Sequence, residues 1–238
     1  MNLPKLWKWT RRSCISAFGD CRWRDARLDV SWVGSPSGGA YVDLAKLNSS
    51  SVIYSFGIAT EISFDRAIIE KTGGQVWGYD PDPRCAQWLH APERWVPPGF
   101  HFTEAALGAK SGRFVFHTTD MERMTGSLSH DVGAGEDIQV QCMTLGDIMK
   151  SNGHEVVDYL KMDIEGAEYE VLKAWLAEYE MLPVRQMWVE FHPGGAKLSE
   201  KDSAGLVRDL AKIGMTPGFR NYFRCPNNYL LVNEGLVF

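Results

Sequence analysis

The chain has 238 residues, of which 45% are hydrophobic and 23% charged, and its formal net charge is −5. The length allows one large α/β domain, with two small domains as the alternative, and the composition is typical of a globular protein with a sizeable core. The acidic balance argues against general affinity for nucleic-acid backbone or for anionic membrane. A small-molecule substrate, or a specific macromolecular one, is therefore expected, and the oligomeric state stays open.

The cysteines lie at positions 14, 21, 85, 142 and 225, without a C-x-x-C pair. This pattern indicates neither a zinc knuckle nor a regular disulfide framework, so a reducing, cytoplasmic location is predicted. No apolar run of about 18 residues occurs, and the basic residues near the start are not followed by an apolar stretch. Neither a membrane span nor a secretory signal is therefore predicted.

Residues 1–50 carry a local basic bias, tryptophans at 7, 9, 23 and 32, and a loop-like Gly/Ser/Pro stretch over 34–39. We interpret them as a lead segment packed on the main domain, residues 51–238, because large aromatic side chains usually bury against a core. A lid or a substrate-binding arm is the alternative interpretation.

Strand-like and helix-like patterns alternate through the main domain. Strands are predicted over 52–56, 75–79, 100–103, 113–117, 138–142, 156–162, 186–190, 215–219 and 229–232. Helices are predicted from Phe64 onward, over 84–90, 145–151 and 167–179, and from a cap at Ser199 to Gly214, with a long polar connection over 118–137. This order favours a doubly wound, mostly parallel sheet covered on both faces.

Gly57 and Asp80 end the first two of these strands, about 20 residues apart. A glycine there lets the backbone turn close to a bound nucleotide or nucleoside, and the acid can accept both ribose hydroxyls. A full G-x-G-x-x-G fingerprint is missing, because Ala59 and Ile62 stand where further glycines belong. A dinucleotide site is therefore disfavoured.

Three acids, Asp163, Glu165 and Glu168, follow the apolar strand over 156–162. The carboxyl edge of an open α/β sheet is where ligands bind. The two glutamates are predicted in the first turn of the next helix, where carboxylates most often act as caps. The clustering of three acids beside Gly166 nevertheless points to an enzyme site.

The segment Tyr159–Glu168, followed by Val171 and Leu172, resembles the signature of the FkbM-type methyltransferases, a branch of the class I fold that uses S-adenosyl-L-methionine. Weaker matches to the family's pattern occur in the expected order at Ala106–Gly108, Thr144-Leu145 and Glu190–His192. The resemblance covers roughly residues 50 to 235.

The resemblance implies a seven-stranded sheet whose last strand is antiparallel, with the methyl donor across the carboxyl ends of the first strands. Gly57 matches the first glycine of the donor loop, Asp80 the ribose-binding acid, and Asp163 the acid after the fourth strand. Two further donor-loop positions depart from the family: Ser55 stands where an acid is usual, and Glu61 where a glycine is usual.

Methyl transfer needs the two reactants held in line, and a base only where the accepting atom carries a proton of high pKa. His192 is the best candidate base from the sequence, with a structural histidine as the alternative. Glu190, two residues earlier, is predicted on the same face as His192, and Glu165 is the third catalytic candidate.

Asp163, Glu165, Glu190 and His192 converge if their two strands are neighbours, and such a set can hold a divalent cation. We predict no metal, because class I methyltransferases mostly work without one. The predicted activity is methylation of an oxygen on a small molecule or sugar hydroxyl, where the oxygen rests on family analogy. The rival hypotheses are a non-catalytic binding protein with this fold, and a nucleotide-sugar or dinucleotide enzyme.

Overall fold

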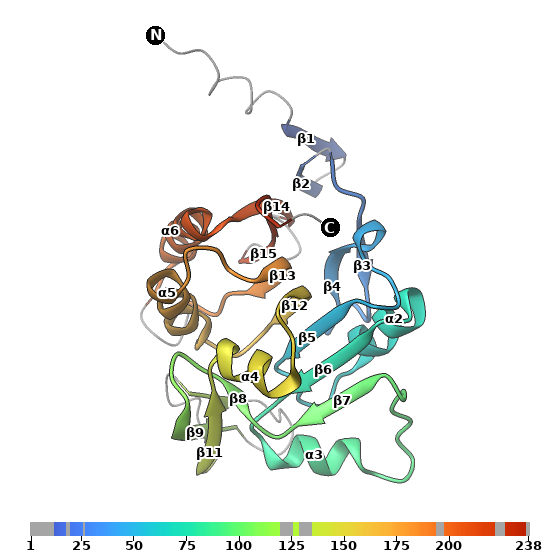
Figure 1. The fold of residues 1–238 in the computed structure, drawn as a ribbon, viewed down its shortest axis with the longest axis vertical. Helices are drawn as coiled ribbons and strands as arrows, with labels where there is room; N and C mark the ends of the chain where they lie inside the picture. The colour runs from blue at the N-terminus through green and yellow to red at the C-terminus, as the bar shows by residue number, and fades with distance from the viewer. Residues whose placement is uncertain are drawn as a thin grey trace.

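The computed structural model describes residues 12–17, 20–25, 27–119, 126–128, 135–193, 198–221 and 227–236. Its main sheet has the strand order β1-β2-β14-β15-β13-β12-β5-β6-β7 (Figure 1). These strands are β1 Arg12–Ala17, β2 Asp20–Asp25, β5 Val52–Phe56, β6 Gln75–Tyr79, β7 Phe100–Thr103, β12 Val157–Met162, β13 Val184–Glu190, β14 Met215–Asn221 and β15 Asn228–Asn233. The strand before the acid cluster, β12, therefore lies inside the sheet, between β13 and β5.

The predicted seven-stranded sheet is confirmed by the strands β14, β15, β13, β12, β5, β6 and β7. Strands β7, β6, β5, β12 and β13 pair in parallel, and β15 is antiparallel to both β13 and β14. The hairpin β1–β2 then extends the sheet along the edge of β14 to nine strands. These two added strands were not predicted, since residues 12–25 lack the apolar alternation of a half-buried strand.

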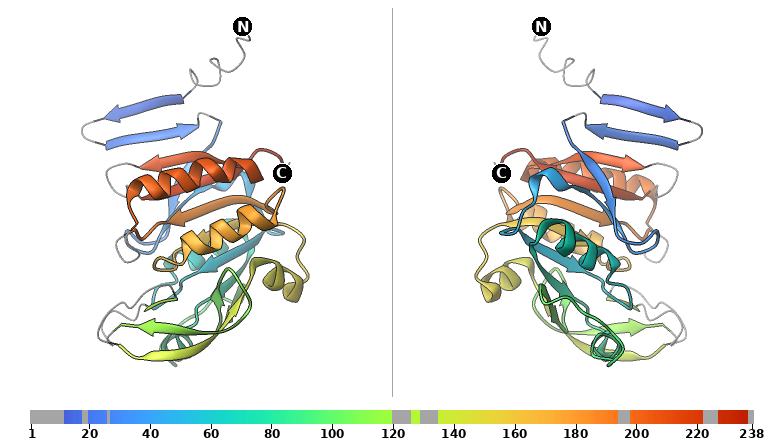
Figure 2. Two further views of the ribbon diagram at one scale, coloured as in Figure 1. Left: turned by 90° about the vertical axis from the view of Figure 1, so that its left-hand side faces the viewer. Right: turned by 90° about the vertical axis from the view of Figure 1, so that its right-hand side faces the viewer.

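Helices cover both faces of the sheet, as predicted. One face carries α2 Ser63–Thr72, α3 Pro83–Leu89 and the hairpin of β3 Val30–Val33 with β4 Ala40–Asp43. The other carries α4 Leu145–Asn152, α5 Glu168–Glu178, α6 Glu200–Asp209 and the short helix η2 Leu210–Ile213. Figure 2 shows α5 and α6 in front of the sheet in one view and α2 in front of it in the opposite view. Each face has its own apolar cluster, so the central strands are buried on both sides.

A second sheet has the strand order β10-β9-β11-β8. Its strands are β8 Ala106–Leu107, β9 Gly112–Thr118, β10 Gly126–Ser127 and β11 Asp137–Met143. Strand β10 lies within the predicted connection over 118–137, of which residues 120–125 and 129–134 lie outside the described residues. This small sheet supplies one wall of the pocket described below.

The predicted helix ends are confirmed by hydrogen bonds. The hydroxyl of Thr144 accepts from the Asp147 N–H at the start of α4, and Ser199 and Asp202 form a capping box at the start of α6. Gly214 follows η2, where the sequence ends the helix. Local sequence therefore determines where these helices begin and end.

Trp188 and Tyr159 are fully buried in the core. The Tyr159 hydroxyl donates to the Tyr41 carbonyl, and Trp188 packs edge-on against Trp32 and Tyr41. Residues of the lead segment thus complete the core on this face, whereas Trp7 and Trp9 lie outside the described residues.

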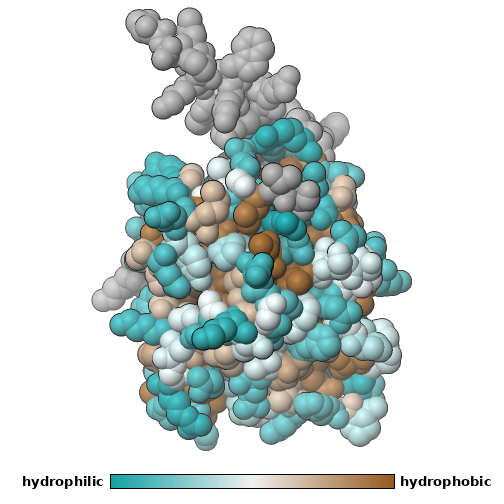
Figure 3. All heavy atoms as spheres, in the orientation of Figure 1, coloured by the Kyte–Doolittle hydropathy of each residue, from teal (hydrophilic) through white to brown (hydrophobic). Residues whose placement is uncertain are grey.

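The visible surface mixes hydrophilic and hydrophobic residues (Figure 3). The large hydrophobic side chains exposed in the described part of the chain are Trp95, Phe114, Val115 and Met181, on three separate segments. None of the helices in the described ranges combines the length and apolar character needed to cross a bilayer.

Candidate active site

A pocket of about 660 Å³, open to solvent, lies at the carboxyl ends of β5, β6 and β12. Three of the predicted donor-site residues, Gly57, Asp80 and Asp163, line it together. The apolar part of the lining comes from Phe56, Tyr79, Ala106, Leu107, Phe116 and Leu128. The pocket therefore combines an apolar wall with acids at the strand ends.

Gly57 lets two strand ends approach closely. Its φ is +84°, and a Cβ atom added there would lie 1.7 Å from the carbonyl oxygen of Asp163. The Asp163 N–H donates to the Phe56 carbonyl, which joins the ends of β5 and β12. The glycine is thus required by the chain's own packing as well as by a pocket at this edge.

Asp80 holds the loop that follows Gly57. One carboxylate oxygen accepts from the N–H groups of Ile58 and Ala59 at 2.9 and 2.8 Å, and the other accepts from the Asp82 N–H. Burial raises the pKa of Asp80 to about 6, against the opposing effect of these hydrogen bonds. Since two carboxylate oxygens offer about four acceptor positions, Asp80 keeps capacity for one more donor in the pocket.

The polar part of the pocket is acidic. Asp80, Asp82, Asp163 and Glu165 line it, and no lysine or arginine is among the described residues that do so. Arg84 forms an ion pair with Asp82, and its side chain is mostly buried beside the pocket. The lining therefore favours a cationic ligand over an anionic one.

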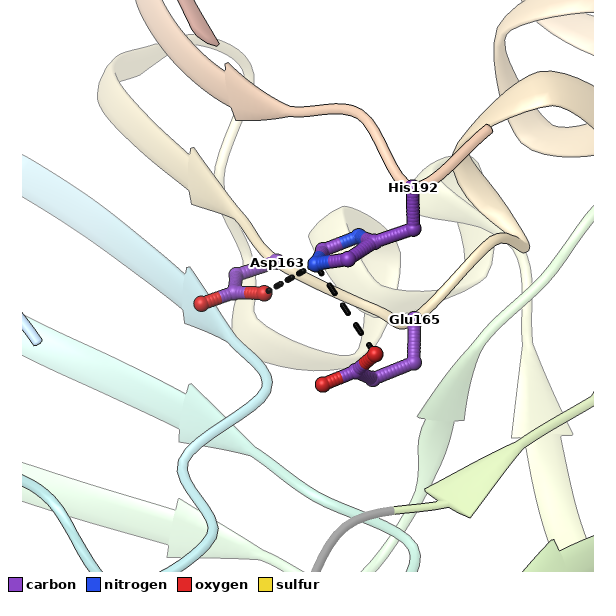
Figure 4. Close-up of side chains that lie close together, drawn as sticks. All are labelled: Asp163, Glu165 and His192. Carbon is purple, nitrogen blue, oxygen red and sulfur yellow. Dashed lines mark ion pairs between the residues drawn. The ribbon is translucent and has the colours of Figure 1, made fainter. Parts of the chain in front are cut away.

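Asp163, Glu165 and His192 come together from the loops after β12 and β13 (Figure 4). The His192 Nε2 atom lies 3.6 Å from Asp163 Oδ1 and 3.8 Å from Glu165 Oε2. Three of the four side chains that were expected to converge thus do so, because β12 and β13 pair in parallel, and Glu190 is not part of this group. The prediction that Glu165 lies in the first helical turn is wrong: α5 begins at Glu168, and Glu165 precedes it in a turn with φ +54°.

Glu168 was noted in the acid cluster but was given no role of its own, and it organises this group of side chains. Its side chain is fully buried and accepts from the N–H groups of Ile164 and Gly166. Its Oε1 atom lies 3.0 Å from His192 Nδ1. Burial lowers the pKa of His192, but the bond to Glu168 and the charges of Asp163 and Glu165 outweigh it and raise the pKa to about 9.

Glu165 and Glu190 have environments that favour their protonated forms. Burial raises the pKa of Glu165, with smaller effects from the neighbouring acids and an opposing one from His192. Burial and the charge of Asp163 likewise raise the pKa of Glu190. Glu190 is within electrostatic reach of His192 but does not line the pocket.

Ser55 and Glu61 are not among the residues that line the pocket. Ser55 is buried in β5, and its hydroxyl bonds to the buried carboxyl group of Asp65 on α2. Glu61 accepts from the Ser63 N–H at the start of α2 and from the Ser35 hydroxyl. Burial opposes ionisation of Glu61, but these bonds hold its pKa below the ordinary value.

The buried pair of Ser55 and Asp65 has a cation nearby. Lys161, only 5% exposed, lies opposite Ser55 on β12 and is attracted to Asp65. Its Nζ atom also lies 3.5 Å from Asp163 Oδ2. Sequence reasoning missed Asp65 and Lys161, since neither stands at a strand end.

The strand order, the antiparallel last strand and a pocket at the carboxyl edge of the first strands define a class I methyltransferase fold. Residues 48–209 match the family described as "Methyltransferase FkbM domain", and the chain belongs to this family.

Two known proteins are similar to this chain in sequence or in structure. A human protein described as "Probable methyltransferase-like protein 24" is 23% identical over 159 residues, which are 66% of this chain and 37% of the human protein. The chain therefore matches little more than a third of that relative's length. The solved structure of a fibrillarin pre-rRNA processing protein from Methanococcus jannaschii superposes with a TM-score of 0.47 at 12% identity, over 92% of both chains.

Proposed function

We propose that the protein transfers a methyl group from S-adenosyl-L-methionine to an oxygen of a small molecule or a sugar hydroxyl. Membership of the methyltransferase family supports the reaction class. The oxygen acceptor rests on analogy with the family. When bound, the donor supplies a methyl group on a positively charged sulfur, and transfer to oxygen leaves a neutral thioether and releases the hydroxyl proton.

The observation that carries the proposal is the charge of the pocket. Its described lining has four carboxylates and neither lysine nor arginine, which suits a sulfonium ion. The apolar wall suits a nucleoside base, and Asp80, with acceptor capacity left, is placed to take a ribose hydroxyl.

The same charges argue against a dinucleotide or nucleotide-sugar enzyme. Such sites bind pyrophosphate with free N–H groups at a helix N-terminus. Here the Glu61 carboxylate accepts from the Ser63 N–H at the start of α2, so a negative charge already occupies that end of the helix. A phosphate would be repelled by Glu61 and by the acids of the pocket.

The proton released from the acceptor needs a base. A pKa of about 9 keeps His192 protonated at neutral pH in the ligand-free protein, so His192 is a poor proton acceptor in that state. Glu165, which lines the pocket and whose pKa is raised, is the better candidate for this role. We assign His192 to holding Asp163 and Glu165 in position.

Calorimetric titration with S-adenosylmethionine, S-adenosylhomocysteine and NAD tests the proposal. Wild-type protein is expected to bind the first two ligands and not NAD. Asp80→Asn is expected to weaken donor binding at least tenfold, since it disturbs both the donor loop and the ribose acceptor. Asp43→Asn is the matched control, because Asp43 is an equally buried acid in β4, outside the pocket.

Tight NAD binding without donor binding would overturn the proposal. Donor binding followed by no transfer to any hydroxyl acceptor would favour the non-catalytic alternative. An acceptor screen with methyl-labelled donor distinguishes methyl transfer from donor binding alone.

A further inference from the structure

We propose that Asp163, Glu165 and His192 bind a divalent cation beside the pocket, in contrast to the metal-free site expected from the sequence. The three side chains each offer one ligand atom, and these atoms lie within 4.8 Å of one another. They combine two carboxylate oxygens with one imidazole nitrogen, a set that Mn²⁺ and Zn²⁺ accept.

The distances suit a shared cation better than direct hydrogen bonds. The separations of 3.6 and 3.8 Å from His192 Nε2 exceed hydrogen-bond length. An ion about 2.1 Å from each ligand, at angles of roughly 90° to 120°, separates the ligand atoms by about 3.0 to 3.7 Å. Since the three ligand atoms lie within 4.8 Å of one another, the carboxylates would have to move closer together around the ion.

The imidazole of His192 is already oriented as a metal ligand. Its Nδ1 atom faces the buried Glu168 at 3.0 Å, and its Nε2 atom faces the two other carboxylates. Glu168 is itself fixed by the N–H groups of Ile164 and Gly166. A carboxylate behind a histidine is the usual support of a metal-binding imidazole, since it fixes the ring and raises its basicity.

The charge of the region also calls for a cation. Asp163, Glu165, Glu168 and Glu190 surround His192, and all four influence one another or the ring. Lys161 approaches only Asp163, at its Oδ2 atom, and leaves Oδ1 directed to His192. Four acidic side chains thus face two cationic groups, Lys161 and His192, and a divalent cation would favour the ionised forms of these acids.

Asp163 and Glu165 line the pocket, so open positions of the bound cation would face it. For the catalytic use of the metal, the inference rests on the proposed function. A cation that binds the acceptor oxygen lowers the pKa of its hydroxyl.

The test is titration of the full chain, first treated with EDTA, with Mn²⁺, followed by electron paramagnetic resonance and calorimetry without any methyl donor. One Mn²⁺ per chain is expected. Glu165→Gln and His192→Gln are expected to weaken binding at least tenfold. Glu168→Gln is expected to weaken it 10- to 100-fold, as is typical for a residue behind a ligand.

His117→Gln is the matched control. The His117 side chain is 26% exposed, as is that of His192, and it pairs with a single carboxylate, Asp137. Paramagnetic broadening by Mn²⁺ is expected at the ring of His192 and not at that of His117. Glu165→Gln keeps the test valid if His192→Gln fails to fold, since Glu165 lies in a loop with a 38% exposed side chain.

Folded wild-type protein that binds no Mn²⁺ or Zn²⁺ would overturn the metal site, as would binding that all three substitutions leave unchanged. Titration with S-adenosylmethionine in the presence of EDTA distinguishes failure of the metal site from failure of the proposed function. Donor binding without metal binding overturns the cation site alone, whereas metal binding without donor binding supports the site and counts against the donor.

Discussion

The Oε1 atom of Glu168 lies 3.0 Å from Nδ1 of His192, although the two residues are 24 positions apart. This contact joins the loops after β12 and β13. It makes one buried carboxylate both the support of the turn at residues 164–166 and the partner of the histidine at the pocket edge.

Glu168→Gln is expected to lower the pKa of His192 from about 9 toward its ordinary value of 6.5. The charge and the best acceptor for the ring are both lost, while a neutral amide still fills the space. Loss of charged acceptors for two buried N–H groups should also destabilise the protein by about 1–3 kcal/mol. NMR titration of the ring in EDTA measures the pKa. Glu170→Gln removes a charge from an exposed position in the same helical turn and should change neither quantity.

The stability of the metal-free protein should depend on pH through His192. A pKa raised in the folded state means that the stabilisation is fully present below about pH 6.5 and is lost as pH rises through about 9. At about 1.36 kcal/mol per pKa unit, it amounts to at most about 3 kcal/mol. Urea unfolding in EDTA should therefore find His192→Gln destabilised at pH 6 and close to wild type at pH 9.5. An equal difference at both pH values would contradict a charged His192.

The fold was predictable because it depends on local periodicity. Apolar runs predicted the strands β5, β6, β7, β9, β11, β12, β13, β14 and β15, and residues such as Thr144 and Ser199 marked the helix starts. The hairpin β1–β2 was not predicted, since an edge ribbon needs no apolar alternation to pair with β14. Strand β10 has only two residues, too few for any periodic signal.

The site was predictable only in part. Gly57, Asp80 and Asp163 could be found because parallel strands end at the same edge of the sheet. Ser55 was expected there as well, yet it lies within β5, where its side chain bonds to Asp65 on α2. Glu168 could be placed at a helix start from the sequence, but its contact with His192 depends on the packing of two loops, which no local pattern encodes.

Gly57→Ala should cost more than about 3 kcal/mol, because strain of a positive φ adds to a clash with the Asp163 carbonyl. Gly153→Ala is the matched control: its φ is +72°, but a Cβ atom there meets nothing within 4 Å. That variant should lose only about 1–2 kcal/mol, the cost of the left-handed conformation. Denaturant unfolding of the two variants measures their losses of unfolding free energy. Equal losses would mean that the β5 and β12 ends move apart easily.

Ser55→Asp restores the acid that FkbM-type sequences usually carry at this position, but we expect it to destabilise this protein. The new carboxylate would lie buried beside Asp65, whose pKa burial already raises to about 6. Two buried acids would then share the charge of Lys161, so a loss of about 1–3 kcal/mol is expected.

The double variant Ser55→Asp/Asp65→Ser exchanges the two side chains and leaves one buried acid near Lys161. If Asp65 supplies the charge that the family places in β5, the exchange should recover most of the stability lost by either single change. A double-mutant cycle from urea unfolding should give a favourable coupling of about 0.5–3 kcal/mol. Additive losses would mean that Asp65 does not substitute for an acid at position 55, and that Ser55 is required only for its size.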